Sequence, residues 1–388
     1  MPSPSSLEIL RRLVGFDTTS RGSNLALIEF VEGYLGNLGV VSERVYDATG
    51  EKANLWATIG PADVPGIILS GHTDVVPVDG QEWQSDPFDL TERDGRLYGR
   101  GACDMKGFLA CVLAAVPSAL SRDLARPIHL AFSYDEEVGC IGVMRLLDAL
   151  KARPNRPRYC IVGEPTSMEV VVGHKAKRSV RATVTGRACH SSLAPQGVNA
   201  VEYAALLIAK LRSIGARLAS QGKRDETYDV PVTTAHTGKI AGGTALNIVP
   251  DRCRFEFEFR VMPGEDPDAL VEEIISYARD TLEPEMRTIA PETGIAFEVF
   301  AAVPGIETAP DGELTHLVQR FAGSNGYAKV AYGTEAGRFK EMLGIETVIC
   351  GPGRIAEAHR PDEYIEVAQL KRCDAFLASL IDWAALAR

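Results

Sequence analysis

The stretch IILSGHTD at residues 67–74 decides the fold, because a short apolar run ends there directly in polar side chains. Three further runs repeat the pattern: IHLAFSYDEE at 128–137, YCIVGE at 159–164, and TVICGPG at 347–353, which leads toward His359. Short apolar runs bounded by glycine and polar residues are typical of buried strands. In an open α/β sheet, ligands bind beyond the carboxyl ends of the strands. The pattern therefore predicts an α/β sheet that delivers polar side chains to one edge.

The character of the chain changes twice along its length. Strand-like and helix-like segments alternate at both ends, which is typical of a layered α/β domain. The middle holds the alternating segments RSVRATVTGRA and RFEFEFR and a long amphipathic helix at 199–220, which indicate a small α+β domain. A chain of 388 residues is also long for one core. We predict an α/β domain with a central mixed sheet at 1–175 and 291–388, interrupted by an inserted α+β domain of ferredoxin-like type at 176–290.

Composition excludes several classes of partner. The chain carries 41 basic and 52 acidic residues, a net charge of −11, which disfavours nucleic acid and anionic membranes. Its first residues lack the basic and apolar regions of a signal peptide, and no apolar run approaches the roughly 20 residues of a membrane helix. Eight cysteines without a CxxC pair indicate free thiols in a reducing compartment. We expect a cytoplasmic protein without a nucleic-acid or membrane partner.

Acidic and histidine side chains follow most of the predicted strands, as ligands of two metal ions would. Asp104 differs from the others, because it lies in GRGACDMKG, a glycine-rich turn that opens a helix. Phosphate binding at the helix N-terminus is the alternative there, but the GxxxxGK[ST] pattern is absent. The candidate residues are His72, Asp74, Asp104, Glu136, Glu137, Glu164 and His359.

These residue types can be divided between two ions. His72 and Glu164 would hold one ion and Glu137 and His359 the other, with the two oxygens of Asp104 between them. Imidazole combined with carboxylate suits zinc, with cobalt or manganese as substitutes. We therefore expect two Zn²⁺ ions per subunit.

The two neighbouring carboxylates of Glu136 and Glu137 can have different roles. Side chains of adjacent residues on an extended segment diverge, so one of Glu136 and Glu137 can bind metal while the other stays free as a base. A bound metal activates water at neutral pH, and the free carboxylate can then move the proton. Asp74 lies two residues after His72 and points to the same side, where it could hold the second imidazole nitrogen.

Seven motifs together resemble one family, the dizinc amidohydrolases and metallopeptidases that cleave N-acyl amino acids and peptides. They are GHTDVVP, GRGACDMKG, DEEVG, GEPT, GRACHSSLAP, GGTALNIVPD and the TEAG…CGPG…AH run. The similarity covers nearly the whole chain in order. It implies a catalytic α/β domain and an inserted lid domain through which the protein forms a homodimer. It also implies metal binding by His72, Asp104, Glu137, Glu164 and His359, with Asp74 as the partner of His72 and Glu136 as the general acid/base.

The inserted domain holds three further candidates. The resemblance implies that His190 stabilises the oxyanion of the intermediate, the alternative being a surface histidine that caps a helix. It implies that Arg260 binds the substrate carboxylate, which a guanidinium does in a bidentate fork; the alternative is an ordinary strand charge. Asn247, near the GGTA segment, is a third candidate for contact with substrate.

The expected reaction is hydrolysis of a small N-acetyl amino acid. By the same resemblance, the desuccinylase branch usually has Ser-Asp-Gly where this chain has Thr334–Glu335–Ala336–Gly337, which favours N2-acetylornithine over a succinylated substrate. N-acetylcitrulline, other N-acyl amino acids, succinyl-diaminopimelate and a dipeptidase or carboxypeptidase activity stay open as alternatives. A non-catalytic binding protein would lack the base or a ligand, and here all of them are present.

Overall fold

The structure is a computed structural model that describes residues 4–386. The chain separates into two compact units. Within the described residues, unit 1 comprises 4–173, 306–329 and 334–386, and unit 2 comprises 174–305 and 330–333. The predicted α/β class with a central mixed sheet is confirmed.

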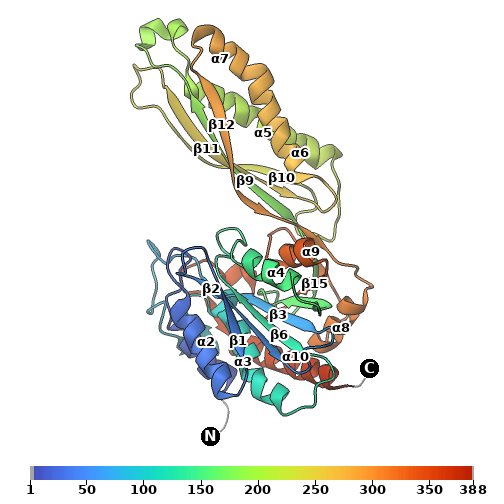
Figure 1. Ribbon diagram of the computed structural model, residues 1–388. Helices are drawn as coiled ribbons and strands as arrows, with labels where there is room; N and C mark the ends of the chain where they lie inside the picture. Colours follow the sequence, from blue (N-terminus) through green and yellow to red (C-terminus); the bar gives the residue numbers. More distant parts are fainter. Residues whose placement is uncertain (1–3, 387–388) are drawn as a thin grey trace. The chain divides into compact units, whose positions relative to one another are not determined.

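Unit 1 is organised around a mixed sheet whose centre is parallel (Figure 1). Strand β3 pairs in parallel with β6 and β7, and β7 pairs in parallel with β15. Strand β2 pairs antiparallel with both β1 and β6. Every residue of β3, β6 and β7 is buried, as expected for strands covered on both faces. In sheet order the strands are β1 (Ser42–Tyr46), β2 (Ala53–Ile59), β6 (Ile128–Ser133), β3 (Ile67–His72), β7 (Tyr159–Val162), β15 (Glu346–Ile349), β8 (Val171–His174) and β13 (Ile306–Glu307), with β14 (Ala328–Val330) paired to β8.

Helices cover both faces of this sheet. On one face Ile67 and Leu69 of β3 share a core with Phe108 of α3 and Phe376 of α10. On the other face α4 packs against α9, and α9 contacts β7 and β15. The helices are α1 (Ser6–Val14), α2 (Leu25–Asn37), α3 (Gly107–Leu120), α4 (Val143–Lys151), α8 (Glu313–Ala322), α9 (Ala336–Leu343) and α10 (Val367–Ala385).

Helix α3 is the most apolar of these elements. With the turn before it, it forms the stretch Ala102–Leu120, which has the length and composition of a membrane span, contrary to the expectation that no run approaches that length. However, 72% of its apolar window is buried inside the protein, and α3 packs against α1 and α10. This is the environment of a core helix.

A small second sheet in unit 1 was not expected from the sequence. It has the order β16-β5-β4 and joins segments far apart in the chain, with Tyr364 opposite Tyr98 and Ile365 opposite Leu97. It therefore brings the segment after His359 next to the segment before Asp104. The strands are β4 (Thr91–Arg93), β5 (Arg96–Tyr98) and β16 (Tyr364–Glu366).

Unit 2 is a four-stranded antiparallel sheet with helices, in the order β10-β11-β9-β12. Its strand–helix–strand–strand–helix–strand succession is that of the ferredoxin-like motif. We predicted its end at residue 290, but β12 lies beyond that point and pairs with β9, so the unit extends to Gly305. The elements are β9 (Ala176–Thr185), α5 (Ala200–Gln221), β10 (Thr234–Gly242), β11 (Arg252–Val261), α6 (Pro267–Tyr277), α7 (Glu283–Ile289) and β12 (Gly294–Val303).

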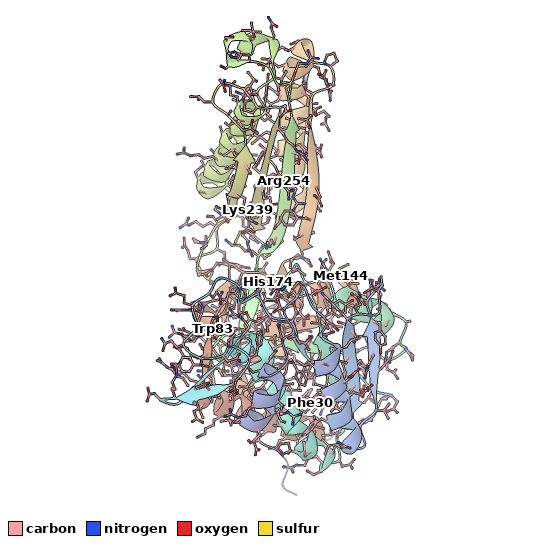
Figure 2. All side chains as sticks on the ribbon, turned by 90° about the vertical axis from the view of Figure 1, so that its left-hand side faces the viewer. Phe30, Trp83, Met144, His174, Lys239 and Arg254 are labelled. Carbon is pink, nitrogen blue, oxygen red and sulfur yellow. The ribbon has the colours of Figure 1, made fainter. Side chains whose placement is uncertain are left out.

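Strand β11 shows why this sheet has one apolar and one charged face. Phe255, Phe257 and Phe259 are buried in a core shared with α5 and α6. Glu256, which alternates with them, forms ion pairs with Arg254 (3.1 Å) and Lys239 (3.6 Å), both labelled in Figure 2. The period-two pattern RFEFEFR is thus a strand with one face in the core.

His129 on β6 gives unit 1 a pH-dependent stability. It stacks on Trp56 and contacts the hydroxyl of Thr58 at 3.0 Å, and burial, assisted by Arg153, lowers its pKa to about 4. In the unfolded chain the pKa of histidine is about 6.5. As the pH falls from about 6.5 to about 4, only the unfolded chain gains this proton, so the free energy of unfolding should fall by roughly 3 kcal/mol.

His129→Phe keeps a ring against Trp56 and removes the proton-binding group. Between pH 7 and pH 4, the free energy of unfolding of the variant should fall by about 3 kcal/mol less than that of the wild type. Urea unfolding of metal-free protein at several pH values measures this, with the exposed His316→Phe as control. Equal pH dependence of wild type and His129→Phe would contradict it.

Candidate functional site

The carboxyl ends of three parallel strands carry most of the predicted metal ligands. His72 is the last residue of β3, Glu136 and Glu137 follow β6, and Glu164 follows β7. Because β6, β3 and β7 are neighbours and parallel, these side chains lie at one edge of the sheet.

Asp104 lies between the two predicted histidines. Its Oδ1 is 3.0 Å from Nε2 of His72, and its Oδ2 is 3.2 Å from Nε2 of His359. It belongs to an irregular turn before α3, where its dihedrals (φ −121°, ψ 94°) depart from those of a helix. The two oxygens of one buried carboxylate thus face two different imidazoles, the arrangement predicted for a bridging ligand.

The remaining carboxylates surround this centre. Nε2 of His359 is 3.1 Å from both oxygens of Glu137, and Nε2 of His72 is 3.9 Å from Oε1 of Glu164. The pairs His72–Glu164 and Glu137–His359 are those assigned above to separate ions. Glu136 also approaches the cluster, because ligand atoms of His72, Glu136 and Glu164 all lie within 4.8 Å of one another. His72, Asp104 and Glu137 form a second group of the same size.

The spacing of these donors fits bound metal ions. Zinc lies about 2.0–2.2 Å from nitrogen and oxygen ligands, so two donors on one ion are about 3–4 Å apart. The separations of 3.0 Å (His72–Asp104), 3.1 Å (His359–Glu137) and 3.9 Å (His72–Glu164) fall in this range. Imidazole nitrogens and carboxylate oxygens are also the donors that zinc accepts.

The electrostatics of the metal-free cluster follow from the same contacts. Burial favours the neutral form of Asp104, but His359 and His72 outweigh it and hold the pKa of Asp104 below its usual value. Hydrogen bonds to Asp104 and Glu137 raise the pKa of His359 to about 10. A metal ion binds neutral imidazole, so metal binding must release the proton that these contacts hold on His359.

Glu136 differs from the other carboxylates in its surroundings. Burial raises its pKa to about 8, and the charge of Glu137 adds to this, although the nearby His72 opposes it. The thiol of Cys140 donates to its Oε1 at 3.1 Å. A carboxyl group whose pKa lies near neutral pH can both accept and return a proton.

Asp74 lies beside the second nitrogen of His72 with both its backbone and its carboxylate. Nδ1 of His72 is 2.9 Å from the backbone carbonyl oxygen of Asp74 and 3.6 Å from its carboxylate. The carboxylate accepts the backbone N–H groups of Glu136 (3.1 Å) and Glu137 (3.3 Å) and the hydroxyl of Ser20 (2.7 Å). Asp74 therefore contacts the imidazole most closely through its backbone, and its carboxylate also holds the Glu136–Glu137 turn.

One buried carboxylate beside the cluster was not predicted as a site residue. Glu335, at the start of α9, accepts hydroxyl hydrogen bonds from Ser70 of β3 and Ser133 of β6, both at 2.7 Å. It thereby ties together the strands that present His72 and Glu136. The signal was its place in the TEAG motif, which we used for the family resemblance and to compare substrate branches but not to assign a site residue.

The three candidates of the inserted domain lie in unit 2. His190 is exposed and caps the short helix Ser191–Gln196 by accepting from the N–H of Ser192. This is the structural alternative considered above, and it leaves Nε2 of the ring for other contacts. Arg260 pairs with Glu258 on the same strand at 2.9 Å, and Asn247 is exposed.

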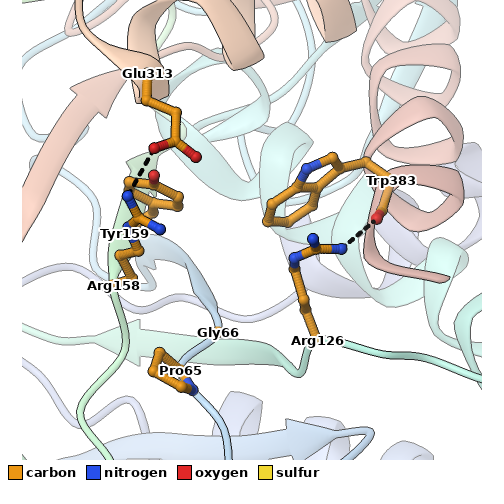
Figure 3. A pocket seen from close by; sticks show the side chains of 7 residues that line it. All are labelled: Pro65, Gly66, Arg126, Arg158, Tyr159, Glu313 and Trp383. Carbon is orange, nitrogen blue, oxygen red and sulfur yellow. Dashed lines mark hydrogen bonds and ion pairs between the residues drawn. The ribbon is translucent and has the colours of Figure 1, made fainter. Parts of the chain in front are cut away.

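A pocket of about 350 Å³ lies at the opposite edge of the sheet (Figure 3). Its lining includes Gly66, just before β3, and Tyr159, the first residue of β7, so it lies at the amino ends of these strands. Arg158 binds Glu313 at 2.6 Å there, and Arg126 lies over the ring of Trp383. The pocket is therefore separate from the metal-ligand cluster.

Curated relatives match almost the whole chain. A chain from Myxococcus xanthus named acetylornithine deacetylase is 36% identical over 383 residues, covering 97% of each chain. Another with that name, from Pectobacterium carotovorum subsp. carotovorum (strain PC1), is 33% identical over 391 residues and 98% of each chain.

Solved structures share the fold at lower identity. An M20 family metallo-carboxypeptidase from Sulfolobus solfataricus has a TM-score of 0.78 at 18% identity, covering 99% of this chain and 100% of that one. A Bacillus subtilis protein described as a dinuclear metal-binding peptidase of the M20 family has a TM-score of 0.66 at 16% identity, covering 97% and 96%. The model of peptidase family M20/M25/M40 matches residues 68–383, and the chain therefore belongs to this family.

Proposed function

We propose that this protein hydrolyses the amide bond of an N-acetyl amino acid, with N2-acetyl-L-ornithine as the substrate and L-ornithine and acetate as products. The observation that carries the proposal is the cluster around Asp104, where two imidazoles face one carboxylate with Glu137, Glu164 and Glu136 beside it. The relatives named acetylornithine deacetylase, 31–36% identical over almost the whole chain, support the choice of substrate. The reaction would supply ornithine for arginine biosynthesis.

Two divalent ions, zinc by the chemistry of the donors, would be held by His72, Asp104, Glu137, Glu164 and His359, with cobalt or manganese as substitutes. When bound, they would supply Lewis-acid chemistry that polarises the amide carbonyl and acidifies water. The protein itself contributes Glu136, which takes the proton of the attacking water and returns it to the nitrogen of the leaving amine. Asp74 keeps Glu136 in place through the N–H groups of the turn.

The residues of unit 2 complete the proposal. We assign to Arg260 the binding of the substrate α-carboxylate, which a guanidinium binds with two parallel hydrogen bonds. His190 would donate to the oxyanion of the tetrahedral intermediate, and Asn247 would contact the substrate. The proposal includes a cytoplasmic homodimer assembled through unit 2, and light scattering of the purified protein tests its mass.

A substrate panel combined with metal removal tests the proposal. The purified protein is assayed with N2-acetylornithine, N-acetylcitrulline, succinyl-diaminopimelate and dipeptides. We expect the highest kcat/KM for N2-acetylornithine, loss of turnover in EDTA and recovery with Zn²⁺. A higher kcat/KM for another member of the panel would identify that compound as the substrate in place of N2-acetylornithine. Turnover unaffected by EDTA, with metal shown to be absent, would refute the metal-dependent mechanism.

A further inference from the structure

A buried ion pair next to the metal-ligand cluster has no place in the mechanism above. Arg100 NH1 and Glu363 Oε2 are 2.6 Å apart, and each side chain is only 1% exposed. Placing two charges in the protein interior is expensive unless further hydrogen bonds satisfy them. The other hydrogen bonds of these two side chains therefore indicate their role.

Glu363 holds the turn that carries Asp104. Its Oε1 accepts the backbone N–H groups of Cys103 (2.9 Å) and Asp104 (3.0 Å). The dihedrals of Asp104 are not helical, so the regular helix ladder does not hold this part of the chain. One carboxylate oxygen thus fixes the backbone of the bridging residue while the other binds Arg100.

Arg100 extends this network toward His359. Its NH2 donates to Oε1 of Gln81 at 2.5 Å, and Nε2 of Gln81 donates to the backbone carbonyl oxygen of His359 at 3.1 Å. Trp83, labelled in Figure 2, donates to the same Gln81 oxygen at 3.1 Å. The chain of contacts therefore runs from the backbone of Asp104 to the backbone of His359.

The backbone of His359 needs such support. Its φ is 64°, in the left-handed region that residues other than glycine seldom adopt. A residue keeps such a conformation only when the surrounding structure holds it. Its imidazole is half exposed, so the core does not fix it by packing.

We infer that Gln81 and the Arg100–Glu363 pair are positioning residues that keep Asp104 and His359 in the geometry required for the ion that His359 binds. The inference rests on the proposed two-metal function and deepens it. Gln81 contacts the backbone of His359 directly and reaches Asp104 only through Arg100 and Glu363, whereas Glu363 contacts the backbone of Asp104, which faces both histidines. The two supports are therefore expected to differ in their effect on the two ions.

Gln81→Met tests the inference, because it keeps the length of the side chain and removes its three hydrogen bonds, to the backbone of His359, to Arg100 and to Trp83. Loss of a residue that orients a metal ligand typically weakens metal affinity about 10–100-fold. We expect this loss mainly for the ion that His359 binds, with an unchanged KM; the melting temperature should fall only slightly, because Arg100 keeps its ion pair with Glu363. Excess Zn²⁺ should restore kcat. Gln84→Met is the matched control, since this side chain lies in the same loop and binds Arg93 instead.

Competition with a fluorescent chelator measures both affinities. Affinities for both ions that are the same in wild type and Gln81→Met would overturn the inference, and so would an equal loss of affinity for both ions. Glu363→Gln is the second variant, and if it folds it should lower the affinity for both ions. If it does not fold, Gln81→Met decides alone. A folded wild type that binds no ion at saturating Zn²⁺ would refute the proposed function itself.

Discussion

Glu136→Gln is expected to leave both metal ions bound and to lower kcat by about 10²–10⁴-fold, the usual contribution of a general acid/base. Glutamine keeps the shape of the side chain but cannot accept the proton of the attacking water. In the metal-free cluster burial raises the pKa of Glu136 to about 8, so this carboxylate takes up a proton more readily than an exposed one. The substitution removes that property and leaves the predicted ligands unchanged.

Metal analysis and steady-state kinetics of the same preparation measure this effect. Glu169→Gln is the matched control, because Glu169 is exposed and lies five positions after the predicted ligand Glu164. We expect its kcat to equal that of the wild type. If Glu136→Gln keeps near-normal kcat with both ions bound, the base has been assigned to the wrong residue. If it loses metal instead, Glu136 is a ligand, as its closeness to His72 and Glu164 would allow.

Asp104→Asn should disrupt the metal centre itself. The substitution removes the negative charge and one of the two oxygens that face His72 and His359. Loss of a residue that merely supports a ligand costs about 10–100-fold in metal affinity, so losing this shared ligand should cost more than about 100-fold. Turnover at micromolar zinc should fall with the metal content.

Isothermal titration of metal-free protein with Zn²⁺ measures the change. Asp123→Asn, at an exposed position of unit 1, makes the same chemical change away from the cluster and should bind two ions as the wild type does. Two-ion binding by Asp104→Asn with unaltered affinity would show that Asp104 does not bridge the ions.

Local sequence patterns were sufficient for the framework of the catalytic unit. IILSG, IHLAFS and YCIV are apolar runs of strand length, and the structure contains them as the buried strands β3, β6 and β7. Glu137 and Glu164 were recognisable because they come directly after such runs. Parallel neighbouring strands end at the same edge, so the meeting of these side chains followed from the strand prediction.

Other features depend on which distant segments pair with one another, and a local pattern does not contain this information. Nothing in GIAFEVF distinguished a strand of the second sheet from one of the first, and only its pairing with β9 assigns β12 to unit 2. Arg100, Glu335 and Glu363 have the same appearance in the sequence as exposed charges. They become buried, and acquire partners, only when β3, β6 and the β16-β5 pair close around them. Burial of a charge is a property of the whole packed fold, because the free energy of a charge depends on everything that replaces its water.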